Sequence, residues 1–374
     1  MLPFTHFILQ KREKKMPADS KQHINEKLDL LFNEIITVRT DDQALKKLKV
    51  IASDLSIENW DWSQGVGIYG IWRLYQVTGK PHYLDYIHGW YQRRLEEGLP
   101  EKNINRMAPM LTLTTMGITQ QDRQHDALIR EYAGWIENQL LRTQENGFTH
   151  CTSDHLNEEQ LWVDTLFMSG LFYARAGAYL NRPDYREEVS YQFLLHIKYL
   201  IDRQTGLWMH GWSFNGPGNY GAALWGRGNG WAAISTVDFL EMLDTQDASY
   251  QMILNTFRRQ ADAAVKYQHE SGMWHTLLNH PDSYLEASGT AGFTYALLKG
   301  IRLGLLDERY QDAAWKGVDA LLSRINAQGE VADVSAGTSV GADLDHYRRI
   351  AIKQRAYGQS LTMLALTEAL AGSQ

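Results

Sequence analysis

QGVGIYGIWRLYQVTGKPHYLDYIHGWYQRRLEEG, residues 64–98, contains two helical patterns of different kinds joined by a short turn. The first is apolar and rich in small residues, which is typical of a helix that is buried on both sides. The second carries a one-sided apolar stripe opposite a charged face, which predicts an amphipathic helix at the surface. The stretch therefore predicts a hairpin of one inner and one outer helix.

The same hairpin plan recurs along the chain, so we interpret the sequence as a set of repeats. Further copies cover residues 104–142, 161–202, 228–268 and 288–325. A lone amphipathic helix at about 24–52 and a lone apolar helix at about 355–371 complete a sixth pair across the two ends. Six such pairs are best closed into an all-α (α/α)6 barrel, a six-hairpin toroid, because the sequence shows no polar capping repeats. An open α-solenoid is the alternative, and strand signals are limited to the short runs at 206–212 and 272–278.

Composition and charge narrow the class of protein. We expect one barrel domain over residues 23–374, preceded by a disordered or loosely docked leader at residues 1–22. A net charge of -7 without a later basic run argues against a nucleic-acid partner. No stretch reaches the length of a membrane span, and the leader's apolar patch precedes its charges, the reverse of a secretory signal. With Cys151 as the single cysteine and no zinc-like spacing, we expect no metal, no cofactor and a cytoplasmic location.

The loops before the inner helices hold most of the residues that carry chemistry. In a toroid these loops gather at one mouth, and here they are rich in Trp, His, Arg, Asn and Gly. Eight of the 12 Trp residues lie within or beside them. Aromatic planes with amide and imidazole donors suit a sugar, which offers C–H faces and hydroxyls. Alternatively, a Trp simply fills space where helices meet, as we expect for Trp135 and Trp315 on outer stripes.

The run LWVDTLFM, residues 161–168, places one carboxylate among apolar residues. If the run is helical, Asp164 shares a face with Leu161 and Phe167. Burying an unpaired ionised carboxylate costs several kcal/mol. Asp164 is therefore paired, kept neutral by a raised pKa, or placed at the lip of a cavity. Pairing with a buried Arg, or capping a helix, is the commoner fate of such a residue.

Four motifs carry a family resemblance: WVDTLFM, HGW, WGRGNGW and YLEASGT, in this order. From about residue 55 to the C-terminus the chain resembles the unsaturated rhamnogalacturonyl hydrolases of glycoside hydrolase family 105, which are related to the unsaturated glucuronyl hydrolases of family 88. The resemblance implies a metal-free, cytoplasmic (α/α)6 barrel. It also implies a substrate among the disaccharides left when polysaccharide lyases cut pectin.

The resemblance implies that Asp164 is the catalytic acid. The substrate's C4=C5 double bond forms an enol ether with the ring oxygen, and hydrating it needs one acid that protonates C4 while water adds at C5. An ordinary glycosidase needs two carboxylates. The apolar helix face is expected to raise the pKa of Asp164, which leaves it partly protonated at neutral pH.

The expected substrate-binding residues come from the same mouth loops: Trp62, Asn105, His150, His210, Trp225, Arg227 and Trp231. Arg227 is expected to pair with the uronate carboxylate. Its alternative role is to tie helix ends together, and His210 has a structural alternative too. Asn105 stands where many relatives have a second acidic residue, and an amide cannot act as a base. Glu286 is the remaining acidic candidate, although LEASGT also fits a helix-capping turn.

Other functions stay open at this stage. The chain could be a family 88-like unsaturated glucuronyl hydrolase acting on other lyase products, or a non-catalytic sugar-binding toroid, against which the intact WVDT argues. Epimerases that share the barrel use paired histidines, and His210 lacks an evident mate. The expected partner is a small oligosaccharide, without nucleic acid or membrane, and the expected state is a monomer or homodimer.

Overall fold

The computed structural model describes residues 18–37, 56–152 and 155–372. Within them, a ring of inner helices closes on itself, because each inner helix contacts the next and the last returns to the first. The inner helices are α3 (Trp62–Thr78), α5 (Ala108–Thr119), α7 (Leu171–Leu180), α9 (Gly226–Leu240), α11 (Ala287–Arg302) and α14 (Ala356–Ala371). The closed ring confirms the predicted toroid and excludes the open solenoid.

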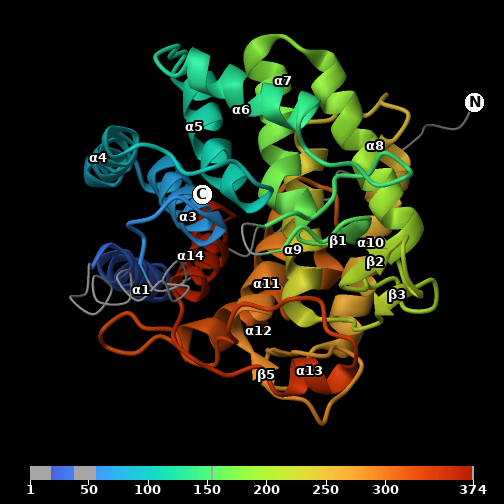
Figure 1. Cartoon of the computed structure of the whole chain (residues 1–374). Coiled ribbons are helices and arrows are strands. Elements are labelled where there is room, and N and C mark those ends of the chain that lie inside the picture. The colour runs from blue at the N-terminus through green and yellow to red at the C-terminus, as the bar shows by residue number, and fades with distance from the viewer. Residues whose placement is uncertain (1–17, 38–55, 153–154, 373–374) are drawn as a thin grey trace, which may run out of the picture.

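A second layer of amphipathic helices surrounds the ring, each packed on the inner helix of its own pair. The outer helices are α4 (Pro81–Glu97), α6 (Asp126–Asn138), α8 (Pro183–Leu200), α10 (Tyr250–Tyr267), α12 (Gln311–Leu322) and α1 (Ala18–Ile36). In Figure 1, where colour follows residue number, the hairpins succeed one another around the barrel in chain order. Helix α1 lies near α14 and contacts it. The sixth pair thus joins the two ends of the chain, as predicted.

The first helix differs from its predicted bounds. α1 begins at Ala18 and ends at Ile36, whereas the sequence pattern indicated a helix over about 24–52. Residues 38–55 lie outside the described residues, and so do residues 1–17 of the expected leader. The domain boundary at residue 23 therefore stays a prediction, with residues 18–22 already helical.

Small residues allow the inner helices to approach closely. α9 and α11 cross at Gly230 and Gly292, where a Cβ added to Gly292 would lie 2.6 Å from the Cα of Gly230. No carbon atoms pack at that separation without moving, so any larger residue at Gly292 would push the two backbones apart. The Gly/Ala-rich pattern of the inner segments is thus a requirement of the ring's packing.

Two small antiparallel sheets lie in the loops. One has the order β1 (Gln160–Trp162), β2 (Gly211–Ser213), β3 (Gly218–Gly221), and the other pairs β4 (Trp274–His275) with β5 (Leu285–Glu286). β2 overlaps the first of the two short runs in which strand signals were expected, and β4 falls within the second. Leu161 is opposite Trp212 in the first sheet, and this register brings the end of β1 beside His210.

The loops at the two ends of the barrel differ in length. Connections that follow inner helices are short, as at Gly79–Lys80 between α3 and α4. Connections that precede inner helices include three long ones, at residues 139–165, 201–225 and 323–355. The long connections contain β1 to β3 and the short helix α13 (Leu344–Arg348). They gather at the N-terminal ends of the inner helices, where the helix dipoles are positive. This end is the predicted mouth.

A network of buried charges lies toward the opposite end of the inner helices. Asp238 on α9 accepts hydrogen bonds from Tyr69 on α3 (2.7 Å), Tyr295 on α11 (2.8 Å) and Lys299 on α11 (2.7 Å). Lys299 also donates to Glu241 at 2.9 Å. Burial raises the pKa of Asp238, but Lys299 and the two tyrosines outweigh it and lower that pKa. The network links α3 with α9, which are not neighbours in the ring.

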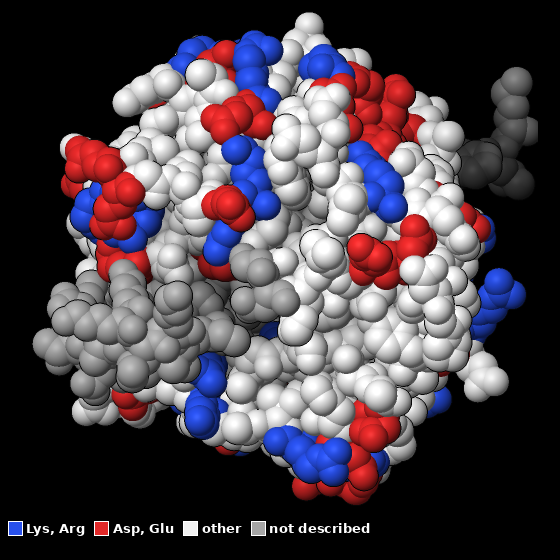
Figure 2. All heavy atoms as spheres, in the orientation of Figure 1, with Lys and Arg blue, Asp and Glu red and all other residues white. Residues whose placement is uncertain are grey.

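The outer surface carries charges of both signs. Figure 2 shows Lys, Arg, Asp and Glu side chains intermingled over the upper half of one face and along its lower rim. Within the part of the chain that the structure describes, no helix is long and apolar enough to cross a membrane.

Candidate active site

Asp164 lies at the start of an inner helix. Its carbonyl accepts hydrogen bonds from the backbone N–H groups of Phe167 (3.1 Å) and Met168 (3.0 Å), and the following turn, η3 (Leu166–Gly170), is a π-helical turn that leads into α7. The expectation that Asp164 lies on a helix face is therefore wrong. Strand β1 extends to Trp162, so helical geometry begins only after Asp164. π-Turns are frequent at functional sites, and hydrophobic periodicity does not reveal them.

Asp164 and His210 face one another at the mouth. The backbone N–H of Val163 donates to the carbonyl of His210 at 3.0 Å, which extends the β1–β2 pairing by one residue. This places Asp164 Oδ2 at 3.4 Å from His210 Nε2. His210 is fully buried, whereas Asp164 keeps 9% of its surface exposed. Of the three placements considered for Asp164, the structure shows pairing, with His210 as the partner.

The pKa of Asp164 shifts in the direction opposite to the expected one. Burial raises this pKa, but hydrogen bonding by His210 and the fields of His210, His150 and Arg227 outweigh burial and lower it. Burial lowers the pKa of His210 itself. At neutral pH the unliganded site therefore holds an ionised Asp164 beside a neutral His210. The expected raised pKa is wrong because the cationic and imidazole neighbours come from other loops, which the helical pattern does not show.

Two indole rings hold the imidazole of His210. Trp162 meets it edge to face, with ring centroids 5.4 Å apart at an interplanar angle of 66°. Trp225 packs on it with centroids 4.3 Å apart. Trp225 is itself almost fully buried, so its ring supports His210 and has little surface left for a sugar.

His150 contacts the same Trp162 ring that meets His210. Its ring stacks on Trp162 with centroids 4.4 Å apart and an interplanar angle of 7°, and its Nδ1 lies 2.8 Å from Thr165 Oγ1. Burial lowers the pKa of His150 to about 4, which leaves the ring neutral at physiological pH. The structure thus brings His150, His210 and Asp164 together around Trp162.

A second aromatic group lies beside the start of α3. Trp62 packs on Tyr357 with centroids 4.7 Å apart and meets Trp231 edge to face at 6.2 Å, while Trp231 packs on Phe167 at 4.8 Å. Trp231 is 1% exposed and Trp62 only partly buried. Of these two predicted stacking residues, Trp62 therefore keeps exposed surface, whereas Trp231 is buried and contacts it edge to face.

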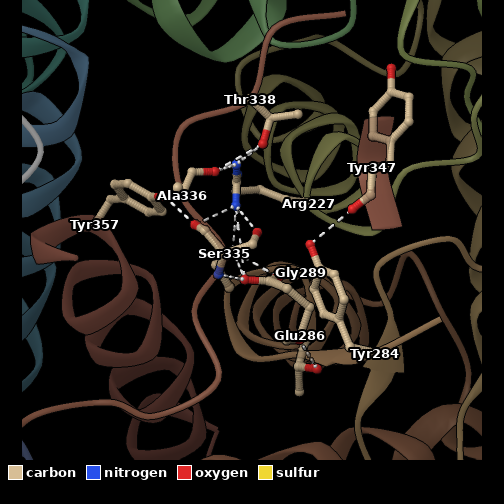
Figure 3. Close-up of polar contacts among 11 residues, drawn as sticks. Arg227, Tyr284, Glu286, Gly289, Ser335, Ala336, Thr338, Tyr347 and Tyr357 are labelled. Atoms are coloured by element: carbon tan, nitrogen blue, oxygen red, sulfur yellow. Dashed lines mark hydrogen bonds and ion pairs between the residues drawn. The ribbon is translucent and has the colours of Figure 1, made fainter. Parts of the chain in front are cut away.

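Arg227 is bound by protein groups in this structure. Its Nη1 donates to Ser335 Oγ (2.6 Å) and to the Ser335 carbonyl (3.1 Å), and its Nη2 donates to the Ala336 carbonyl (2.8 Å) and Thr338 Oγ1 (2.7 Å) (Figure 3). Its guanidinium also lies over the ring of Trp225, 4.5 Å from the centroid. These contacts support the tying role of Arg227, since a uronate carboxylate would have to displace them.

Glu286 is a helix cap. Its carboxylate accepts hydrogen bonds from the N–H groups of Gly289 (2.6 Å) and Ser335 (2.9 Å) and from Ser288 Oγ (2.7 Å) (Figure 3). It is 1% exposed, and it satisfies the first turn of α11. The helix-capping interpretation is confirmed, and the Glu286 carboxylate is not free to act as a second acid.

Asn105 opens a short 3-10 turn, η2 (Asn105–Met107), which contacts η3 beside Asp164. Its side chain is partly exposed, and among the described residues we find no hydrogen bond to it. Asp61 stands nearby as the N-cap of α3, where it accepts from the N–H of Trp62 at 2.7 Å. Within the described part of the chain, the amide of Asn105 thus has no partner that fixes its orientation.

Sequence reasoning missed the segment 335–348, which joins the site at three points. Arg227 holds its start, Val340 packs on Gly211 and Gly221 so closely that a methyl group on either glycine would clash, and Tyr347 Oη lies 2.8 Å from His210 Nδ1. The segment has no Trp and no motif that marks it. Its partners at these three points lie over 100 residues away in sequence, so a local pattern could not have found it.

A ring of six helical hairpins, with a carboxylate and aromatic rings at the mouth, defines a six-hairpin glycoside hydrolase. The chain belongs to Glycosyl Hydrolase Family 88, whose sequence profile matches residues 36–372. It is 33% identical over 344 residues to the unsaturated rhamnogalacturonyl hydrolase YesR of Bacillus subtilis (strain 168), an alignment that covers 91% of this chain and 97% of that protein.

Two solved structures resemble the whole chain. One is a possible member of the GH105 family from Salmonella enterica serovar Paratyphi A, with a TM-score of 0.91, 37% identity and 99% of both chains covered. The other, from Klebsiella pneumoniae, is described in the same words and has a TM-score of 0.87 at the same identity and coverage. The resemblance inferred from the four motifs is confirmed.

The contacts of Arg227 lead to a prediction that differs from the one made by sequence alone. From sequence, Arg227→Lys should weaken substrate affinity more than folding stability. From the structure, it should lower the free energy of unfolding by about 1–3 kcal/mol, because an ammonium cannot replace four donated bonds and leaves buried acceptors unpaired. Urea unfolding measures the change.

The matched control is Arg130→Lys, on a side chain that is 58% exposed and pairs with Asp126 on the surface of α6. It should leave the free energy of unfolding nearly unchanged, because water replaces this exposed ion pair. Unchanged stability of Arg227→Lys together with a raised KM would restore the uronate-binding role.

Proposed function

We propose that the enzyme releases unsaturated (Δ4,5) galacturonic acid from the disaccharide left by rhamnogalacturonan lyase, by hydrating the C4=C5 enol ether with Asp164 as general acid. The observation that carries the proposal is the allotment of carboxylates at the mouth. Glu286 caps α11 and is 1% exposed, and Asp61 caps α3 and lies 3.7 Å from Arg106 Nε, whereas the side chain of Asp164 faces His210. Enol-ether hydration needs one such acid, whereas ordinary glycoside hydrolysis uses two.

The reaction consumes one water and balances through the sugar ring. Asp164 gives its proton to C4, and the positive charge that develops at C5 is shared with the ring oxygen. Water adds its oxygen at C5 and returns a proton to the site, which forms a hemiketal. The bond from C5 to the ring oxygen then breaks to give a C5 ketone, and the hemiacetal left at C1 collapses and releases the aglycone alcohol.

The substrate itself supplies a reason for Asp164 to be protonated. The resting site holds an ionised carboxylate, and the uronate brings a second negative charge into the mouth. A like charge nearby disfavours the ionised form of Asp164 and raises its pKa. The N-terminal ends of the inner helices favour the anion. Binding of the uronate therefore shifts Asp164 toward the protonated form that the chemistry requires.

Isotope labelling distinguishes hydration of the enol ether from ordinary glycoside hydrolysis. Turnover of unsaturated galacturonyl-rhamnose in D2O should place deuterium on C4 of the released keto-uronate, and labelled water should place its oxygen at C5. Saturated galacturonyl-rhamnose should be inert because it lacks the enol ether. Label at C1, or comparable turnover of the saturated disaccharide, would overturn both the reaction and the role of Asp164. Faster turnover of unsaturated glucuronyl-hexosamine would instead assign a family 88-like substrate.

Location and assembly complete the proposal. We place the enzyme in the cytoplasm as a monomer or homodimer, with a small oligosaccharide as its partner. A single cysteine supports a reducing compartment, since it allows no intrachain disulfide. Light scattering coupled to size exclusion measures the assembly, and any state beyond a dimer would contradict it.

A further inference from the structure

Tyr347, in segment 335–348, contacts His210, which in turn faces Asp164. It lies on α13, is fully buried, and its Oη is 2.8 Å from His210 Nδ1, on the side of the imidazole opposite Asp164 (Figure 3 shows its position on α13). The backbone N–H of Gly341 donates to the same oxygen at 3.1 Å. Asp164, His210 and Tyr347 therefore form a line from the mouth into the protein.

The hydrogen bonds decide which way the hydroxyl hydrogen of Tyr347 points. Gly341 is a donor, so it occupies a lone pair of Oη and cannot accept. Within the described residues, the remaining partner of Oη is His210 Nδ1. If Nδ1 carried the proton, the Tyr347 hydroxyl hydrogen would be buried without an acceptor, and the bare Nε2 would face a carboxylate oxygen. Both are unfavourable, so Tyr347 donates and Nδ1 accepts.

We propose that Tyr347 is a positioning residue that holds His210 in the tautomer with its proton on Nε2, directed at Asp164. The 3.4 Å between Nε2 and Oδ2 is long for a hydrogen bond, as is common in unliganded active sites whose contacts tighten when the substrate binds. Tyr347 acts on the reaction through His210 and does not itself reach Asp164. Its catalytic consequence rests on the proposed function, whereas the tautomer does not.

The fixed tautomer has a chemical purpose in the proposed reaction. A neutral imidazole that donates from Nε2 holds the Asp164 carboxylate in place without pairing a full positive charge with it. A protonated His210 would stabilise ionised Asp164 and oppose its protonation. By occupying Nδ1 with a donor, Tyr347 keeps that nitrogen from taking a proton. The charged groups that act on His210 are Asp164, which favours its protonation, and Arg227 and His346, which oppose it.

Tyr347→Phe removes the hydroxyl and keeps the ring. We expect kcat to fall by about tenfold to a hundredfold, the range seen when the partner that orients a functional histidine is lost, with KM nearly unchanged. The pKa of His210 should rise, so the acidic limb of the kcat–pH profile should move to higher pH. An unchanged kcat and an unmoved limb would overturn the catalytic role.

The matched control is Tyr284→Phe. Tyr284 Oη donates to the backbone carbonyl of Tyr347 at 3.2 Å, so it secures α13 without touching His210 (Figure 3). If Tyr347 merely holds the segment in place, the two variants should lose kcat equally and neither should shift the pH limb. That result would contradict the proposal, whereas a shift confined to Tyr347→Phe supports it.

The tautomer can be observed without any substrate, which separates this proposal from the proposed function. In protein labelled with ¹⁵N-histidine, the signals of His210 are assigned as those missing from His210→Asn. The wild type should show a bare Nδ1 and a protonated Nε2, and Tyr347→Phe should show a mixture of tautomers. A proton on Nδ1 in the wild type would overturn the assignment even if the enzyme turns over every expected substrate.

Discussion

Asp164→Asn is expected to lower kcat by about 10² to 10⁴, the usual contribution of a general acid, while the fold and substrate binding stay nearly intact. An amide has the size of the carboxylate but no proton to give to C4. The pKa of Asp164 is lowered in the folded protein, so losing its charge should cost some stability without unfolding the chain. The loss of the enol ether's ultraviolet absorbance measures kcat, and the shift of the melting temperature by substrate measures binding.

Asp61→Asn is the control variant that separates the role of Asp164 from that of Asp61. Asp61 caps α3, and Asn caps a helix about as well as Asp, so this variant should fold and keep most of its turnover. If Asp61→Asn loses as much activity as Asp164→Asn, then the enzyme uses two carboxylates. Activity of Asp164→Asn above a tenth of the wild-type value would refute the assignment of the acid.

The buried charges at the other end of the barrel carry the largest expected effect on stability. Asp238→Asn should lower the free energy of unfolding by about 3–5 kcal/mol, because it leaves the ammonium of Lys299 buried without its full counter-charge. Both side chains are 1% exposed, so water cannot compensate. Equilibrium unfolding in urea measures the loss, and a loss below about 1 kcal/mol would contradict this account.

The ionisation of Asp238 should also affect how the stability of the protein depends on pH. The pKa of Asp238 is lowered in the folded state, so its stabilising contribution is complete above its ordinary pKa near 3.8 and is lost as the pH falls through the lower folded value. The stability of the wild type should therefore decline more steeply than that of Asp238→Asn below about pH 4. Parallel declines would show that Asp238 is not ionised in the native protein.

Asp262 is a surface carboxylate that, like Asp238, accepts hydrogen bonds from a tyrosine and a cationic side chain. It therefore provides the control for Asp238→Asn. Asp262 accepts hydrogen bonds from Tyr310 (2.7 Å) and Arg309 (3.0 Å), with 57% of its side chain exposed. Asp262→Asn should cost about 0–1 kcal/mol, because water replaces the lost interactions. The difference between the two variants isolates the effect of burial from the effect of losing an acid.

The helical architecture could be predicted from the sequence because burial leaves a local mark. A helix covered on both sides must be apolar and small all round, and a helix covered on one side must carry a stripe, so the two kinds alternate visibly along residues 64–98 and their repeats. The absence of polar caps was enough to predict that the ring closes. The four motifs were likewise enough to locate Asp164 and His210 and to assign the family, since these depend on residue identity and order.

The state of the site could not be predicted in this way. The pKa of Asp164 and the ligands of Arg227 depend on segment 335–348 or on loops far from them in sequence. Tyr347 lies 137 residues from His210 and belongs to no motif. Electrostatic fields and hydrogen bonds sum over whatever neighbours the folded chain supplies, whereas periodicity reports only whether a side chain is buried. The fold could therefore be predicted from the sequence, whereas the protonation of Asp164 and His210 depends on loops that only the tertiary structure brings together.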